Sequence, residues 1–154
     1  MTKIYQTIIL LLIVVIAAGA YKFIVQGSVT ESPDGRVTIH MSAAERNLVL
    51  GEMRAFLASV QQITQGVAEN NMQRVVEYAR KVGRAAQGEV PGSLIGKLPL
   101  EFKKLGFDTH DKFDQLALNA ESLGDAGQVS TQLAELMQNC VGCHAVYRID
   151  VEQP

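Results

Sequence analysis

The sequence has few of the residues on which several classes of protein depend. It has no tryptophan, and its aromatic residues are only five phenylalanines and four tyrosines, which disfavours a surface on which nucleic-acid bases stack. The 14 basic and 16 acidic residues leave a net charge of −2, so there is no basic excess of the kind that binds nucleic acid. No Ser-His-Asp order, phosphate loop or paired-carboxylate motif indicates an enzyme. We therefore expect neither nucleic-acid binding nor enzymatic activity by the chain itself.

Cysteine is also scarce. The only two cysteines are Cys140 and Cys143, near the C-terminus. Two cysteines this close in sequence cannot form the disulfide framework that stabilises small secreted proteins. Their role must therefore be a local one.

Long apolar runs are limited to the N-terminus. Lys3 precedes an apolar stretch, and Ile4 to Val25 covers 22 residues, enough to span a bilayer. We predict a signal-anchor or transmembrane segment over residues 1–25. The small residues that end at Ala20 also fit a signal cleavage site, so a cleaved signal is the alternative. Both interpretations place the rest of the chain on the non-cytoplasmic side.

The remaining sequence predicts a linker followed by helices. Residues 26–41 contain turn-forming residues and predict a linker, in which 36–40 could be extended. From residue 42 onward, apolar residues recur at three- and four-residue spacings, as in amphipathic helices. Ser42 and Glu45 form a capping-box pattern at the first helix. Predicted helices cover 42–66, 69–87, 109–123 and 130–149, with a short helical turn at 98–105.

These segments predict an all-α fold. Four amphipathic helices joined by mostly short loops are typical of an antiparallel four-helix bundle. We assign this bundle to residues 42–154, preceded by the N-terminal transmembrane or signal helix. No β-hairpin pattern competes with this prediction.

The two cysteines belong to the pattern Cys140-Val141-Gly142-Cys143-His144. This is C-x-x-C-H, the attachment motif of c-type haem. Each thiol adds to one vinyl group of the porphyrin, and the adjacent imidazole binds the iron. A thioredoxin-like pair would need a βαβ context, and a zinc site would need a second pair of ligands. We therefore predict one covalent haem c, attached through Cys140 and Cys143, with His144 as an axial ligand.

The position of this motif resembles that in class II cytochromes c, the cytochrome c-prime group. Class I cytochromes place it near the N-terminus, whereas here four predicted helices end in the motif and in Tyr147-Arg148. The resemblance covers roughly residues 42–148. It implies that Arg148 lies beside the face of His144; a solvated arginine near a helix end is the alternative.

The resemblance also implies that the sixth iron position faces the first helix of the bundle. Low-spin members of the family supply a methionine there, and high-spin members cover an open site with an apolar residue. Met53 and Leu50 are the two candidates in this sequence, and core filling is the other explanation for Met53. His110 is predicted to be a surface or capping residue.

Two functions follow from these alternatives. With Met53 bound to iron, the chain would be a one-electron carrier for redox proteins of a respiratory chain, at the periplasmic face of a bacterial inner membrane. It would be soluble in the periplasm if the signal is cleaved. With Leu50 over an open site, it would bind a gas such as nitric oxide or carbon monoxide. Family members often form homodimers through the first two helices, so a homodimer is a further expectation.

Overall fold

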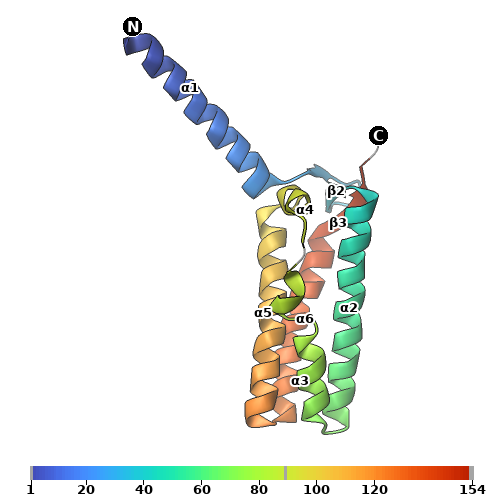
Figure 1. Cartoon of the computed structure of the whole chain (residues 1–154). Coiled ribbons are helices and arrows are strands. Elements are labelled where there is room, and N and C mark those ends of the chain that lie inside the picture. Colours follow the sequence, from blue (N-terminus) through green and yellow to red (C-terminus); the bar gives the residue numbers. More distant parts are fainter. Residues whose placement is uncertain (1, 89, 153–154) are drawn as a thin grey trace.

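The computed structural model describes residues 2–88 and 90–152, and this part of the chain is mostly helical. It contains six α-helices and one three-stranded sheet. Figure 1 shows α2, α3, α5 and α6 side by side, with the sheet across one end and α1 projecting from that end. The helices are α1 (Thr2–Ala20), α2 (Ala43–Ala68), α3 (Met72–Arg80), α4 (Gly92–Lys97), α5 (Leu100–Leu123) and α6 (Ala126–Val146); the strands are β1 (Val29–Glu31), β2 (Val37–Met41) and β3 (Tyr147–Val151).

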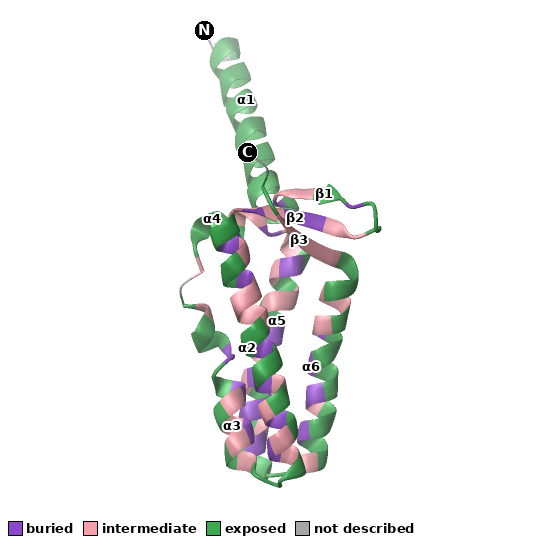
Figure 2. Ribbon diagram, turned by 90° about the vertical axis from the view of Figure 1, so that its right-hand side faces the viewer, coloured by how far each residue is buried: buried purple, intermediate pink, exposed green. Residues whose placement is uncertain are grey.

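The N-terminal helix is exposed along its length (Figure 2). It runs from α1 directly into π-helical turns at Tyr21–Gln26. The span Lys3–Gln26 has 24 residues and a mean hydropathy of 2.7. This is long and apolar enough to cross a membrane, and a signal sequence has the same properties. The predicted apolar N-terminal helix is confirmed to that extent.

The end of this helix packs against the rest of the chain. The ring of Phe23 lies over Gly96 of α4, where an added Cβ would be only 2.2 Å from a ring carbon. Lys103 Nζ of α5 donates to the carbonyl of Ile24 at 3.0 Å. The amide of Ser28 donates to the carbonyl of Lys97 at 2.7 Å. Close contact at a glycine and these two hydrogen bonds attach the N-terminal helix to α4 and α5.

The predicted capping box at the start of α2 is confirmed. Ser42 Oγ accepts a hydrogen bond from the Glu45 amide at 3.2 Å, and Glu45 Oε2 accepts one from the Ser42 amide at 2.8 Å. Two amides without a partner inside the helix are thereby satisfied. The helix continues two residues beyond the predicted end, to Ala68.

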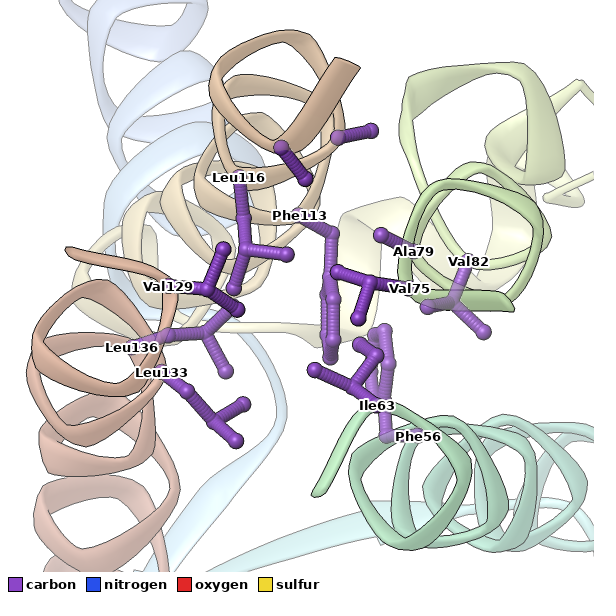
Figure 3. Packing of buried hydrophobic residues seen from close by; sticks show 12 residues of the cluster. Phe56, Ile63, Val75, Ala79, Val82, Phe113, Leu116, Val129, Leu133 and Leu136 are labelled. Carbon is purple, nitrogen blue, oxygen red and sulfur yellow. The ribbon is translucent and has the colours of Figure 1, made fainter. Parts of the chain in front are cut away.

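A common apolar core lies between the four side-by-side helices (Figure 3). The rings of Phe56 and Phe113 stack at its centre, with their centroids 5.5 Å apart. Burial of a large apolar side chain contributes about 1.5–3 kcal/mol, so this cluster is the main source of tertiary stability. Its buried members are Phe56, Ile63, Val75, Ala79, Val82, Phe113, Leu116, Ala117, Ala120, Val129, Leu133 and Leu136.

Two predicted helix boundaries are wrong. The predicted turn at 98–105 and the predicted helix at 109–123 are one helix, and α5 is continuous through Gly106 over Leu100–Leu123. A helical glycine costs only about 1 kcal/mol, which is less than burial of Phe102 and Phe113 on one helix face contributes. Conversely, the helix predicted at 69–87 is split into α3 and a short 3-10 turn, Arg84–Gln87.

The boundaries of α6 also differ from the prediction. The helix begins at Ala126 and not at residue 130, and Asp125 caps it, because its carboxylate accepts from the Gly127 amide at 2.8 Å. The helix was predicted to reach residue 149, but it ends at Val146 and the chain continues as β3. Pairing with another strand replaces the helical hydrogen bonds there.

That other strand comes from the segment predicted to be a linker. Strands β1 and β2 form a hairpin with Val29 opposite Ile39, and β2 pairs in parallel with β3. The expectation of an extended piece at 36–40 is confirmed by β2, whereas the expectation of an all-α fold without a β-hairpin is wrong at this end of the chain. Ile39 and Met41 are fully buried. They form a second apolar cluster with Val49, Leu94, Leu98 and Phe102.

An ion-pair network stabilises the same end of the molecule. Lys97 Nζ lies 2.8 Å from Glu45 Oε2 and 2.9 Å from Glu152 Oε1. Ser93 Oγ donates to Glu45 Oε1 at 3.0 Å. The Lys97 hydrogen bond, followed by that of the Ser42 amide, lowers the pKa of Glu45 to about 2. The network links α2, α4 and the C-terminal segment.

We expect Glu45→Gln to reduce the free energy of unfolding by about 2 kcal/mol at pH 7. The folded-state pKa lies below the ordinary value, so the contribution is complete above about pH 4.5 and is lost as the pH falls toward 2. Urea unfolding in detergent, followed by circular dichroism, measures this. Glu77→Gln removes an exposed ion pair with Lys81 and should cost less than about 0.5 kcal/mol. Equal effects of the two changes at pH 7 would contradict the prediction.

Candidate haem site

Cys140 and Cys143 lie in the last turns of α6, and both are half-buried free thiols. Cys140 packs against the first apolar cluster and Cys143 against the second. Burial raises the pKa of Cys143 to about 11 and also raises the pKa of Cys140. Both thiols are therefore protonated near neutral pH, which disfavours a reactive redox thiolate. The two cysteines thus lie between the first and the second apolar cluster.

The residues of α6 around the motif differ in exposure. Leu133 and Leu136 are buried, whereas Val141 is 70% exposed and Met137 38% exposed. His144 is also exposed overall. The buried face is rotated toward Asn139, because α6 packs mainly against α5 and only lightly against α2.

A cavity of about 200 Å³ lies beside Cys143 and His144. It brings together most of the predicted site residues, because Met53 and Leu50 of α2 lie on its wall with His144. Cys140 is not on that wall. The lining residues are Arg36, Leu50, Met53, Phe102, Cys143, His144, Tyr147, Arg148 and Ile149.

Both candidates for the sixth iron position therefore contribute to the same cavity. Leu50 and Met53 are half-buried and stand one turn apart on α2. Met53 also packs against both apolar clusters, which supports a core-filling role as well as a ligand role. Both residues line the cavity, so either one could occupy the predicted sixth position.

His110 lies elsewhere, and its prediction as a surface residue is wrong. It is only 3% exposed, with Nδ1 2.7 Å from the Val82 carbonyl oxygen and Nε2 3.1 Å from a Glu52 oxygen. Burial lowers its pKa, but the hydrogen bonds to Glu52 and Val82 outweigh this effect, so its pKa is raised. Its first-turn position suggested exposure, whereas packing of α2 and α3 on α5 covers it.

The charged groups at the cavity are arginines. Arg148 Nη2 donates to Asp150 at 3.0 Å, and Nη1 donates to Ser32 Oγ at 3.2 Å. Arg36 donates to Asp34 through Nη2 at 2.7 Å. Hydrogen bonds from Arg36 and Ser32 hold the pKa of the Asp34 carboxyl well below its usual range. Arg148 therefore contacts the hairpin and is not simply a solvated helix-end residue.

The sequence reasoning missed several residues of this cavity. Phe102 and Tyr147 meet edge to face, with centroids 5.3 Å apart, and Ile149 lies on the same wall. Tyr147 lies three residues after His144, so its proximity could have been foreseen. Arg36 carries no such signal, because only the pairing of β2 with β3 brings it beside residues that follow it by more than a hundred positions.

These residues fit a flat apolar ring that carries carboxylates and a central metal. The cavity offers apolar and aromatic walls, an imidazole, one of the two motif thiols and two guanidinium groups. Within residues 2–88 and 90–152, no three His, Cys, Asp or Glu side chains are grouped as a metal site would require. At about 200 Å³ the cavity is smaller than typical cofactor sites of about 300–1,000 Å³, so these residues would contact part of such a ring.

No family model, curated protein or solved structure matches the chain.

Asn139, next to Cys140, fixes α6 against α5 through buried polar contacts. Its Nδ2 donates to Asp108 Oδ2 at 2.7 Å and to Thr109 Oγ1 at 3.2 Å. Its Oδ1 accepts from Lys112 Nζ at 3.0 Å. These bonds set the position of the first motif cysteine relative to α5.

We expect Asn139→Ala to reduce the free energy of unfolding by about 1–3 kcal/mol, since it leaves partly buried partners unsatisfied. The neighbouring Gln138 is exposed, so Gln138→Ala is the matched control and should change it by less than about 0.5 kcal/mol. Urea unfolding of the full chain in detergent measures both. Similar values for the two variants would show that the Asn139 contacts contribute nothing.

Proposed function

We propose that the chain is a c-type cytochrome with one covalent haem, of the class II type, built on an antiparallel four-helix bundle. The observation that carries this proposal is the shared cavity: Cys143 and His144 of the motif lie on one wall, and Met53 and Leu50 of α2 lie on the same cavity. Four side-by-side helices with a common core support the bundle. The motif and the geometry thus point to the same cofactor.

In this proposal each residue has a definite task. Cys140 and Cys143 would hold the haem through thioethers, His144 would bind its iron through the imidazole, and Arg148 would add positive charge at the cavity. Apolar side chains keep water from the ring. The bound haem supplies a reversible one-electron couple.

The resulting function is electron transfer and not an enzymatic reaction. The apolar N-terminal helix supports a tether at the inner membrane, with the haem-bearing helices in the periplasm. Redox proteins of a respiratory chain are the proposed partners, and a homodimer is compatible with the exposed faces of α2. If the signal is cleaved, the same carrier would be soluble in the periplasm.

Gas binding is the second candidate function. It is supported by Leu50, an apolar residue on the cavity wall beside Met53. In that case Leu50 would cover an open iron position that takes nitric oxide or carbon monoxide. The residue over the iron separates the two functions.

We expect the chain to retain haem after denaturation when it is made in cells that attach haem c. The double variant Cys140→Ser, Cys143→Ser should lose all covalent haem, because it has no thiol to form a thioether. Val141→Ser, between the two cysteines and 70% exposed, should retain it. Haem staining of a denaturing gel measures all three chains. An unstained wild-type chain, or a stained double variant, would refute the proposed haem attachment.

Optical spectra with and without carbon monoxide test the carrier function. For electron transfer we expect a low-spin spectrum, a weak far-red band of sulfur ligation in the ferric form, and no response to carbon monoxide. Met53→Leu keeps the side-chain volume and should abolish that band, whereas Leu50→Ala should leave it. A high-spin wild-type spectrum that shifts with carbon monoxide would refute Met53 ligation and support gas binding.

A further inference from the structure

Arg36 is the cavity residue that neither the motif nor the family resemblance assigns. It lies directly before β2, at the end of the hairpin turn, and β2 pairs with β3 from Val37 opposite Tyr147 onward. This pairing holds the hairpin over the same end of the helices as β3 (Figure 2). Arg36 therefore reaches the cavity beside His144 from a different part of the chain than the motif.

The charge on the cavity wall has one sign. Arg36 and Arg148 are the permanently charged members of the lining, and the described lining includes no carboxylate. Their acidic partners, Asp34 and Asp150, lie outside it. Positive charge next to an apolar wall favours an anionic ligand, since charges interact more strongly away from bulk water.

Asp34 orients both arginines. Its Oδ2 accepts from Arg36 Nε at 3.0 Å and Nη2 at 2.7 Å, and it lies 3.8 Å from Arg148 Nη1. A guanidinium presents five N–H groups in a planar fork that matches a carboxylate. Because one edge of the Arg36 guanidinium is bound to Asp34, the orientation of its remaining N–H groups is fixed.

We propose that Arg36 binds a carboxylate of the haem, and that Asp34 is the positioning residue that directs it. This rests on the proposed haem function and deepens it, since it names which part of the cofactor the hairpin recognises. The alternative role for Arg36 is purely structural: it would only close the turn by pairing with Asp34. The two roles differ in their effect on the haem potential.

The test is spectroelectrochemistry of the haem-loaded full chain in detergent across a range of pH. Arg36→Gln removes a positive charge near the iron, which favours the ferric state and lowers the midpoint potential. We expect a shift of roughly tenfold in the ferric-to-ferrous ratio at pH 8, or about 59 mV for one electron. An ionised carboxylate without its guanidinium binds protons more readily, so the pH at which the potential begins to fall should move upward. Arg36→Lys should restore most of the potential.

Arg80→Gln is the matched control, because Arg80 pairs with Glu121 on the exposed faces of α3 and α5. It makes the same change of charge and breaks an ion pair, so its potential and pH profile should match those of the wild type. If Arg36→Gln gives the control's potential and profile and changes only unfolding stability, Arg36 is structural and the inference is wrong. Failure of the haem proposal itself is distinguishable, since the wild-type chain would then carry no covalent haem.

Discussion

The parallel pairing of β2 with β3 is the interaction on which the candidate site depends. Strand β3 begins directly after α6, three residues beyond His144, and its pairing with β2 extends from Tyr147 to Val151. This pairing turns Tyr147, Arg148 and Ile149 onto the cavity wall and brings Arg36 to the same place. If the helix continued, these three side chains would point in different directions around the helix axis. The residues of β3, together with those at the end of α6, thus form one side of the cavity.

Helix α2 supplies the opposing side of that pocket and joins it to the core. Met53 packs against both apolar clusters, whereas Cys140 and Cys143 each pack against one of them. A change of residue at position 53 would therefore affect packing as well as any bond to iron. Leu50, one turn earlier, lies on the same cavity. The two proposed functions, electron transfer and gas binding, would therefore depend on two neighbouring positions of one helix.

Charge and membrane attachment are also organised around this end of the molecule. The chain is close to neutral overall, with a net charge of −2, yet the permanent charges on the cavity wall are both positive. The N-terminal apolar helix leaves the same end of the molecule (Figure 1). Phe23 on α4 and Lys103 of α5 hold it there.

Local patterns were sufficient for much of this description. The apolar N-terminal run, the capping box of Ser42 and Glu45, and the helical spacing of Phe56 and Ile63 depend on neighbours a few residues away, and each appears in the structure as expected. The C-x-x-C-H motif is equally local. Predictions failed where distant contacts override local preference. Gly106 stays helical because Phe102 and Phe113 of the same helix are buried. His110 is covered by Glu52 and Phe56 of α2 and by Val82.

The cavity and its charges arise from contacts between distant parts of the chain. Arg36 and Arg148 are more than a hundred residues apart, and nothing near Arg36 in sequence indicates a role beside the motif. Strand pairing depends on backbone hydrogen bonds between whole segments, which side-chain periodicity within either segment does not specify. The C-x-x-C-H pattern is therefore visible in the sequence alone, because its residues are adjacent. The pocket around it was decided by the tertiary pairing of the hairpin with the C-terminal strand.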